Sequence, residues 1–364
     1  IMPDAQIVAI TGTNGKSTTT ALIAHMVNAV GRHAEMGGNI GKPVFDLDPP
    51  RRDTIYVVEV SSYQIDLAPT LRPNIGVLLN VTPDHIDRHG TLENYAAIKG
   101  RLFRHQGKDD TAVIGVDDQL SADICTSVCG RREAKLVPVS VQKTLGRGTY
   151  VIDGVLYDSR SGKTDRVGEL RELKRLAGAH NWQNAAAAYS VGRELGFPAE
   201  KILAAFKTFP GLAHRMEIVA EAADILFVND SKATNAEAAA KALDAYEDVF
   251  WIAGGVAKAG GIRSLEPWFG HVAHAYLIGE AADAFAETLT NHLPFSKSDT
   301  LDAAIAEATT HAVAAARAGR KPVVLLSPAC ASFDQFKNFE ARGDAFRTMV
   351  QAAVKALPRG GAAA

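Results

Sequence analysis

The sequence predicts an α/β protein in which a mostly parallel sheet domain is followed by a second, Rossmann-like doubly wound domain. Short apolar runs alternate with stretches of helical period along nearly the whole chain, a pattern typical of parallel strands joined by covering helices. The pair Pro210-Gly211 follows a predicted helix, and beyond it the series of strands and helices starts again. We therefore expect one domain over residues 1–211 and another over 212–364, joined by a hinge.

The strands are expected at the short apolar runs. The helix after the first run has apolar residues at helical spacing and ends at Gly31. Segment 148–170 alternates in polarity and is rich in turns, which suggests a small antiparallel flap on the first sheet. The predicted strands are 7–10, 54–60, 74–81 and 111–116 in the first domain, and 225–229, 248–255, 275–279 and 322–327 in the second.

The composition is that of a globular protein. The 364 residues carry a formal net charge of −2, with 47% apolar and 22% charged residues, so no overall basic field favours nucleic acid. The apolar runs are too short to span a membrane, and no signal peptide opens the chain. Three cysteines without a CxxC pair argue against a disulfide framework or a structural zinc site. We expect a cytoplasmic monomer that acts on small molecules, with neither nucleic acid nor membrane as a partner.

Residues 9–18, AITGTNGKST, follow the first predicted strand and are typical of a P-loop-type phosphate-binding turn. The strict pattern G-x4-G-K-[ST] is met at residues 15–17, although its first position is not glycine. Gly12 and Gly15 let backbone N–H groups approach phosphate, Lys16 supplies a positive charge to ATP, and Ser17 can bind Mg²⁺. The alternative is an ordinary strand–turn–helix with a surface lysine, but strand, loop, lysine and amphipathic helix occur in the order that phosphate binding requires.

A carboxylate at the end of a neighbouring strand often completes such a metal site. Glu59 is the candidate, because it is an acid inside the apolar run 54–60. The alternative is an edge-strand glutamate that faces water. Burying a charge among strand-forming residues is costly without a cation, so we favour the metal ligand.

A second candidate lies on the helix predicted over 91–105. Lys99 is on the apolar stripe of this helix, three residues after Ala96 and three before Leu102. Its long stem could instead carry the amine to the surface. In the loop before this helix, His85 could complete a second metal site with Lys99, if the lysine lost its proton and took up CO₂ as a carbamate, since burial beside a cation lowers the pKa of a lysine.

Together these segments resemble the Mur ligase family, the ATP-dependent amide-forming enzymes of peptidoglycan precursor synthesis. Family members also carry an N-terminal domain that grips a uridine nucleotide, and the start at Ile1 leads us to expect that this chain lacks it. Within the family, 228–235 and 325–346 resemble the member that adds D-glutamate. The other segments that carry the resemblance are TGTNGKST (11–18), GGNIG (37–41), EVSSYQ (59–64), NVTPDHIDRH (80–89), the Lys99 helix, HNWQN (180–184) and HR (214–215).

The resemblance implies a role for each matching residue. Catalytic roles fall to Lys16, His85, Lys99 and Lys258. Of two Mg²⁺ ions, the first is held by Ser17 and Glu59 and the second by His85 and carbamylated Lys99. ATP contacts fall to Gly12, Thr13, Asn14, Gly15, Lys16, Ser17, Thr18, Asn181, Arg215 and Asp230. The acceptor substrate is contacted by Asn39, Ser61 and His85, and the D-glutamate pocket is formed by Lys232, Thr234, Lys258, Ser332, Phe333 and Phe339.

The residues themselves support part of this pocket. Thr234 and Lys258 each follow a predicted strand of the second domain, which is where ligand sites of α/β sheets lie. A dicarboxylate amino acid requires cations and hydroxyl groups, and Lys232 and Ser332 add to both.

The resemblance implies a ligase that joins D-glutamate to UDP-N-acetylmuramoyl-L-alanine through an acyl phosphate at the expense of ATP. One alternative is a sister enzyme, another Mur ligase or a folylpolyglutamate-type amino-acid ligase, which shares the ATP machinery. The other alternative is an ATP-binding module with little ligase activity.

Overall fold

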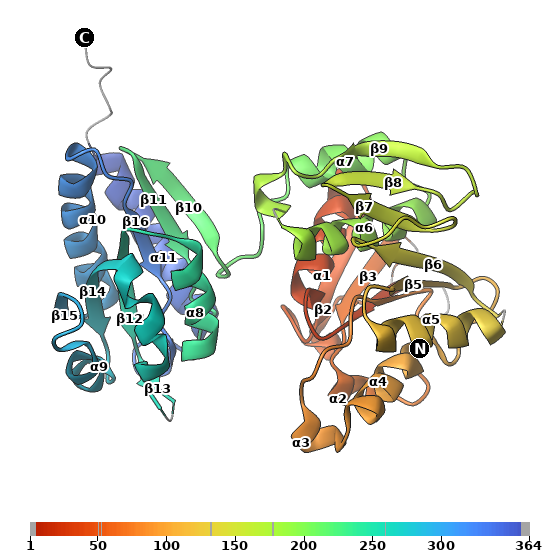
Figure 1. The fold of residues 1–364 in the computed structure, drawn as a ribbon, viewed down its shortest axis with the longest axis horizontal. Helices are drawn as coiled ribbons and strands as arrows, with labels where there is room; N and C mark the ends of the chain where they lie inside the picture. The colour runs from red at the N-terminus through yellow and green to blue at the C-terminus, as the bar shows by residue number, and fades with distance from the viewer. Residues whose placement is uncertain are drawn as a thin grey trace, which may run out of the picture. The chain divides into compact units, whose positions relative to one another are not determined.

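The computed structural model describes residues 5–49, 51, 53–131, 133–176, 178–258 and 260–357. The chain forms two compact units, Ile1–Gly211 and Leu212–Ala364, and each has its own sheet and core (Figure 1). No helix in these described ranges is long and apolar enough to cross a bilayer.

The first unit contains a nine-stranded sheet in the order β2-β3-β1-β4-β5-β6-β7-β8-β9. Neighbours from β2 to β7 run parallel, and β7, β8 and β9 continue the edge as an antiparallel meander, which confirms the predicted flap. The strands are β1 (Gln6–Thr11), β2 (His33–Gly38), β3 (Thr54–Glu59), β4 (Ile75–Leu78), β5 (Thr111–Gly115), β6 (Lys135–Ser140), β7 (Thr149–Ile152), β8 (Val155–Asp158) and β9 (Asp165–Glu169).

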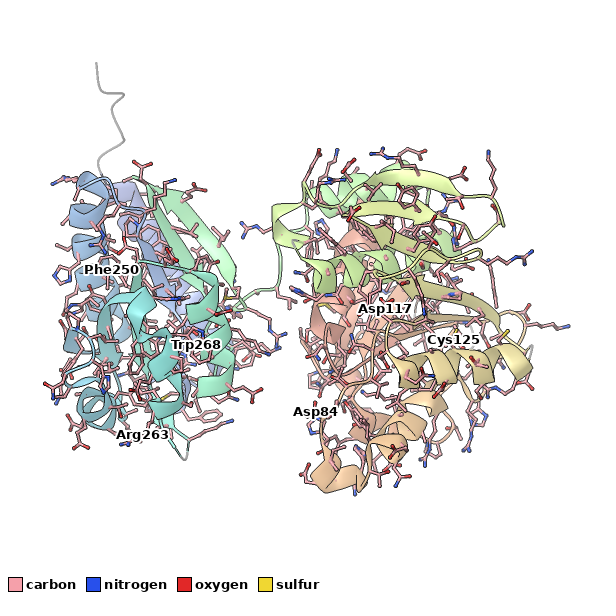
Figure 2. The ribbon with its side chains drawn as sticks, in the orientation of Figure 1. Asp84, Asp117, Cys125, Phe250, Arg263 and Trp268 are labelled. Carbon is pink, nitrogen blue, oxygen red and sulfur yellow. The ribbon has the colours of Figure 1, made fainter. Side chains whose placement is uncertain are left out.

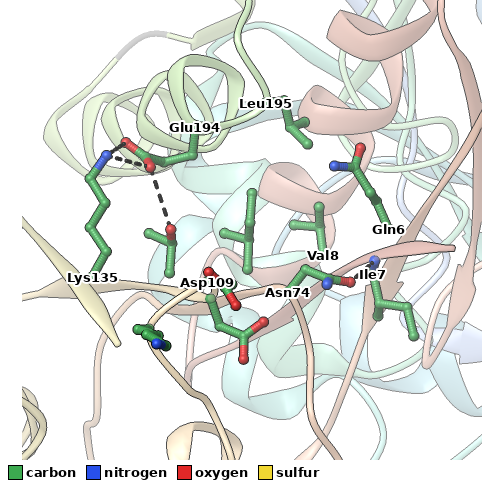
Figure 3. A pocket seen from close by; sticks show the side chains of 12 residues that line it. Gln6, Ile7, Val8, Asn74, Asp109, Lys135, Glu194 and Leu195 are labelled. Atoms are coloured by element: carbon green, nitrogen blue, oxygen red, sulfur yellow. Dashed lines mark hydrogen bonds and ion pairs between the residues drawn. The ribbon is translucent and has the colours of Figure 1, made fainter. Parts of the chain in front are cut away.

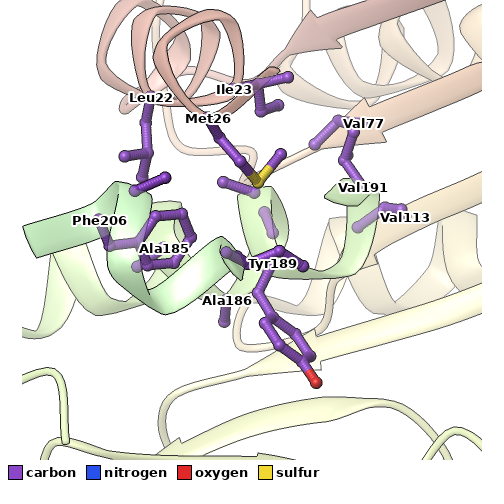
Figure 4. Packing of buried hydrophobic residues seen from close by; sticks show 14 of the residues in the cluster. Leu22, Ile23, Met26, Val77, Val113, Ala185, Ala186, Tyr189, Val191 and Phe206 are labelled. Atoms are coloured by element: carbon purple, nitrogen blue, oxygen red, sulfur yellow. The ribbon is translucent and has the colours of Figure 1, made fainter. Parts of the chain in front are cut away.

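Helices cover both faces of this sheet. Apolar residues of α1, α6 and α7 form one core, in which Met26, Ala185 and Phe206 pack together (Figure 4). Residues of α2, α4 and α5 form the core of the opposite face. Each buried aliphatic or aromatic side chain contributes roughly 1.5–3 kcal/mol by leaving water, so these layers hold the strand ends in place. The helices are α1 (Lys16–Ala29), α2 (Ser62–Leu67), α3 (Ile86–His89), α4 (Leu92–Gly100), α5 (Gln119–Arg131), α6 (Ala179–Glu194) and α7 (Ala199–Lys207), with 3-10 turns at Val44–Asp46, Arg101–Phe103 and Lys174–Leu176.

The second unit is doubly wound. Its six-stranded sheet has the order β10-β11-β16-β12-β14-β15 and is parallel except for β10. Phe250 belongs to the core under α10 and α11, whereas Trp268 packs on the other face with α8 and α9 (Figure 2). The strands are β10 (Glu217–Ala222), β11 (Ile225–Asn229), β12 (Val249–Gly254), β14 (Val272–Ile278), β15 (Phe295–Asp299) and β16 (Val323–Leu326), with a separate pair of β13 (Val256–Ala257) and β17 (Cys330–Ala331); the helices are α8 (Ala236–Ala245), the 3-10 helix η4 (Arg263–His271), α9 (Ala282–Leu289), α10 (Leu301–Arg317) and α11 (Phe339–Ala356).

Two features differ from the sequence predictions. The helix expected over 91–105 ends as an α-helix at Gly100 and tightens into a 3-10 turn over Arg101–Phe103. Strands β2, β6, β10 and β15 are not indicated by long apolar runs, because each includes polar or exposed residues. Their place in the sheets comes from pairing with neighbouring strands rather than from apolar patterning.

Candidate functional site

The loop between β1 and α1 has the conformation that phosphate binding requires. Gly15 has φ 83°, in the left-handed region, and a Cβ there would clash with Oδ1 of Asn184 on α6. No side chain caps the first turn of α1, so the positive end of the helix faces the loop uncovered by any capping group. In the loop, the N–H of Thr13 donates to the backbone oxygen of Asn80 at 2.9 Å. The N–H of Asn14 donates to Oδ1 of the same residue, also at 2.9 Å.

Lys16 begins α1 and turns back over the loop. Its Nζ donates to the carbonyl oxygens of Gly12 at 3.0 Å and Thr13 at 2.9 Å. Ser17 is buried, and Thr18 is half-buried beside it. The predicted nucleotide-binding residues 12–18 therefore form one continuous turn at the carboxyl end of β1.

Glu59 ends β3 at the same edge of the sheet, and its side chain is 2% exposed. It is not an edge-strand residue, because β3 lies between β2 and β1. Its Oε1 accepts a hydrogen bond from Nδ2 of Asn39 at 3.0 Å, whereas its buried Oε2 has no hydrogen-bond partner among the described residues. A buried carboxylate oxygen without a donor is costly, and a divalent cation with oxygen preference satisfies it.

Lys99 on α4 is 1% exposed, so the alternative of a stem that reaches the surface is wrong. Its Nζ donates to the carbonyl oxygen of Gly12 at 2.9 Å and to Oγ1 of Thr11 at 3.4 Å, and it lies 4.5 Å from the centre of the Tyr95 ring. Burial, and then the charge of Lys16, lower the pKa of Lys99 to about 7, against an opposing effect of the Asp84 carboxylate.

His85 lies in the loop between β4 and α3, one residue after Asp84 (Figure 2). It is exposed, has the left-handed φ of 51°, and packs against Tyr63 and Tyr95 at ring-centre distances of 5.2 and 6.2 Å. Tyr95 thus contacts both His85 and Lys99. The described ranges contain no group of three or more His, Cys, Asp and Glu residues that could hold a metal ion.

The remaining predicted residues of the first unit have defined roles in the fold. The backbone N–H of Asn39 donates to the backbone oxygen of Glu59 at 2.9 Å, which places Asn39 directly at the metal candidate. Ser61 caps α2 in a reciprocal pair with Gln64, so its hydroxyl already serves the helix. Oδ1 of Asn181, near the start of α6, accepts from Nδ2 of Asn184 at 3.2 Å.

Asp230 follows β11 in the second unit and is buried. It accepts hydrogen bonds from Oγ of Ser327 at 2.8 Å and from the N–H of Met216 at 3.2 Å. Burial raises the pKa of Asp230 to about 6, although these hydrogen bonds and the charge of Arg215 act in the opposite direction. Arg215 is exposed.

The predicted amino-acid pocket lies at the carboxyl ends of β11, β12 and β16. The Nζ atom of Lys232 lies 5.6 Å from the centre of the Phe339 ring. The backbone N–H of Thr234 donates to the carbonyl oxygen of Lys232 at 2.9 Å. The pairing of β13 with β17 joins the segment before Lys258 to the segment before Ser332. Ser332 is buried, Lys258 is exposed, and Phe333 is 73% exposed.

The comparisons with known proteins identify the family of this chain. The Mur ligase middle domain matches residues 10–192, and the Mur ligase glutamate ligase domain matches 214–330. A UDP-N-acetylmuramoylalanine–D-glutamate ligase from Brucella abortus is 54% identical over 99% of this chain and 76% of its own length. The protein of the same name from Phenylobacterium zucineum is 51% identical over 95% of this chain and 73% of its own. The chain belongs to the Mur ligase family.

The fold of this Mur ligase is shared with distant relatives as well. The structure of the MurF ligase from Thermotoga maritima in complex with ADP superimposes with a TM-score of 0.59 at 19% identity, over 97% of this chain and 81% of the other. At that identity the likeness concerns the fold alone. It confirms the prediction of two successive α/β domains.

Two residues of this Mur ligase were not predicted from the sequence as parts of the site. Asn80 holds the phosphate loop through Asn14 and donates from Nδ2 to Gln183 on α6 at 2.9 Å. Its signal was a polar residue inside the apolar run 74–81, two residues beyond the end of β4. Arg342 is buried in the second unit, within a segment quoted for the resemblance, and nothing in its sequence pattern marks it as different from a surface arginine.

A cavity of about 200 Å³ in the first unit is unrelated to this site (Figure 3). It lies at the amino ends of β1, β4 and β5, opposite the phosphate loop. The charged groups of Lys135 and Glu194 at its wall are paired with each other at 2.7 Å, and Oδ1 of Asn74 accepts from the N–H of Ile7. This cavity therefore presents mostly satisfied polar groups.

Proposed function

We propose that this Mur ligase joins D-glutamate to UDP-N-acetylmuramoyl-L-alanine in an ATP-dependent step of peptidoglycan precursor synthesis. The observation that carries the proposal is the carboxyl edge of the first sheet. There Lys16, the buried amine of Lys99 and a Glu59 oxygen with no hydrogen-bond partner in the described part of the chain belong to adjoining segments. We take the identity of the substrates from the names of relatives that are 51–54% identical over nearly the whole chain.

The reaction follows from the chemistry of the two substrates. The terminal carboxylate of the acceptor attacks the γ-phosphorus of ATP, and ADP leaves with the bonding electrons. The amine of D-glutamate then attacks the acyl phosphate, loses a proton, and the C–O bond to phosphate breaks to leave an amide. Lys16 would counter the negative charge of the transferred phosphoryl group, and the N-terminus of α1 would hold the phosphates.

Two Mg²⁺ ions would supply the remaining positive charge when bound. Ser17 and Glu59 suit the first ion, because one is a buried hydroxyl and the other has an unsatisfied buried oxygen. His85 and a carbamylated Lys99 would hold the second. With a pKa of about 7, a large share of Lys99 is neutral at physiological pH. The neutral amine attacks the carbon of CO₂, forms an N–C bond and releases one proton, which yields an oxygen ligand of negative charge.

The second unit would bind D-glutamate and contribute to ATP binding. Lys232, Lys258, Thr234 and Ser332 offer cations and hydroxyl groups for the two carboxylates, and Phe333 and Phe339 would line the pocket. Arg215 and Asp230 would contact ATP, together with Asn181 of the first unit. Because ATP and the nucleotide-linked acceptor are cytoplasmic metabolites, we infer a cytoplasmic enzyme. We also expect a monomer, which sedimentation analysis tests.

The test is product formation across a set of amino acids. The full chain is incubated with ATP, Mg²⁺ and UDP-N-acetylmuramoyl-L-alanine, together with D-glutamate, L-glutamate, meso-diaminopimelate or L-alanine. We expect phosphate release and a new amide product, identified by mass, with D-glutamate alone. A product with a different amino acid would identify a sister ligase. Nucleotide binding without any product would identify an ATP-binding module.

A further inference from the structure

The second unit buries one arginine completely. Arg342 lies in the first turns of α11 and is 1% exposed. Its Nε donates to Oγ of Ser231 at 3.0 Å, and its Nη2 donates to the carbonyl oxygens of Ser231 at 2.9 Å and Cys330 at 3.0 Å. Its Nη1 donates to the carbonyl oxygen of Ala331 at 3.4 Å. All these acceptors are uncharged.

These contacts join the segments that carry the proposed amino-acid pocket. Ser231 directly precedes Lys232, and Ala331 directly precedes Ser332. Ala331 also pairs with Val256, two residues before Lys258.

The hydroxyl of Ser231 extends the same network to the aromatic wall of the pocket. It donates to the carbonyl oxygen of Phe339 at 2.8 Å. One guanidinium group therefore links the Lys232, Ser332, Lys258 and Phe339 segments.

No carboxylate in the described ranges forms an ion pair or a hydrogen bond with Arg342, although the negative charge of Asp334 acts to raise its pKa. Burial lowers the pKa of Arg342 to about 10, so the group stays cationic at physiological pH. Arg160 in the first unit provides a contrast, since it is also largely buried but is paired with Asp158 and Glu194. An unpaired buried charge is costly for stability, which indicates a use other than folding.

We propose that Arg342 is a positioning residue for the dicarboxylate amino acid, holding the Lys232 and Ser332 segments together and adding a fixed positive charge behind them. Five N–H donors in one plane suit this task, since several carbonyl oxygens can be bound at once. The inference rests on the proposed function, because the pocket is the one assigned to D-glutamate. It adds a residue that does not itself contact the substrate.

The test compares Arg342→Lys and Arg342→Gln with wild type in the full chain. The Michaelis constants for D-glutamate, ATP and the acceptor are measured, together with the melting temperature. We expect Arg342→Gln to raise the KM for D-glutamate about tenfold or more, while the KM for ATP changes less than twofold. Arg342→Lys keeps the charge but loses the planar set of donors, so we expect an intermediate rise.

Two further variants keep the test decisive if Arg342→Gln does not fold. Ser231→Ala removes the hydroxyl that joins Arg342 to Phe339, and we expect a rise of about threefold in the KM for D-glutamate. We also expect a lower melting temperature, because the Nε of Arg342 loses its buried acceptor. Arg160→Lys is the matched control in the first unit. It should lower the melting temperature and leave the KM for D-glutamate unchanged.

The inference is overturned if the folded variants lower stability alone, or if they raise all three Michaelis constants equally. A wild-type chain that forms no product with D-glutamate would instead refute the proposed function. The two failures are therefore distinguished by the wild-type reaction.

Discussion

Lys99 in the first unit and Arg342 in the second are both 1% exposed, and both donate hydrogen bonds to backbone carbonyl oxygens. In the described part of the chain neither is paired with a carboxylate. Burial nevertheless lowers the pKa of Lys99 to about 7 and that of Arg342 only to about 10. The lysine can lose its proton and become a nucleophile, whereas the arginine remains a fixed charge. Similar burial is thus compatible with both proposed tasks, modification of Lys99 and positioning by Arg342.

The surroundings sharpen this difference. The Nζ atoms of Lys16 and Lys99 both donate to the carbonyl oxygen of Gly12, at 3.0 and 2.9 Å. Two ammonium groups at one oxygen repel each other, and the deeper of the two gives up its proton more readily. Arg342 has no cation of this kind among its hydrogen-bonding neighbours.

We expect the largest effect when Lys99 is replaced by arginine, the type of cation found at position 342. Lys99→Arg keeps a positive charge but cannot form a carbamate, so it should lower kcat by about 100-fold or more, as does loss of one electrostatic contact to a reacting group. Lys99→Ala should be equally impaired, and a short-chain carboxylic acid should partly restore its activity. Phosphate release that depends on D-glutamate is the measurement. Normal turnover of Lys99→Arg would show that arginine can replace lysine at position 99. The assignment of Lys99 to a second metal site would then be wrong.

The second prediction concerns pH and stability. The pKa of Lys99 in the folded state is about 7, below its ordinary value of 10.5, so between these values the unfolded chain binds more protons and stability rises with pH. From pH 6.5 to 9 the free energy of unfolding of wild type should rise by about 2.5 kcal/mol relative to Lys99→Met. Chemical denaturation in EDTA measures this difference.

Arg342→Met is the comparison for this pH series. Arg342 stays charged throughout the interval, so the stability difference between its variant and wild type should not change with pH. Parallel pH profiles for the Lys99 and Arg342 variants would contradict the distinction between the two cations.

The third prediction concerns the buried anion of the first unit. Glu59→Gln removes the negative charge but preserves the amide contact to Asn39, so the Mg²⁺ concentration for half-maximal activity should rise about tenfold or more, since even the loss of a group that only supports a metal ligand costs about tenfold or more. Titration of activity with Mg²⁺ measures it. Glu35→Gln is the control, because Glu35 is also buried but pairs with His33 and Lys42. Equal Mg²⁺ requirements in Glu59→Gln and wild type would remove Glu59 from the metal site.

We expect the smallest effect at Asn80, which holds the phosphate loop. Lys99 lies against the same loop. Asn80→Ala loses the hydrogen bonds to Asn14 and Gln183, so the KM for ATP should rise about fivefold, near 1 kcal/mol. Asn74→Ala is the matched control at the opposite end of the strand, where its Oδ1 accepts from Ile7. If both variants change the KM for ATP equally, Asn80 has no specific role in the loop.

Several features of the site could be predicted from the sequence because their signals are local. The phosphate loop is a contiguous motif, and the place of Lys99 on an apolar stripe follows from the spacing of its own helix. The acid in strand 54–60 indicated Glu59 in the same way. Which alternative held for Glu59 and Lys99 could not be decided locally, since an edge strand and a surface-reaching stem leave the same pattern.

The sequence by itself determined the two series of strands and helices, the loop for phosphate and the polar residues that follow the strands. Only the tertiary structure decided that one oxygen of Glu59 has no donor among the described residues, that two lysines share the Gly12 carbonyl, and that Arg342 binds three backbone carbonyls. The reason is physical: Lys99 and Gly12 are 87 residues apart, and Arg342 and Ser231 are 111 apart. Hydrogen-bond partners and burial depend on which distant segments the fold brings together, whereas apolar spacing and turn motifs are properties of the neighbouring residues alone.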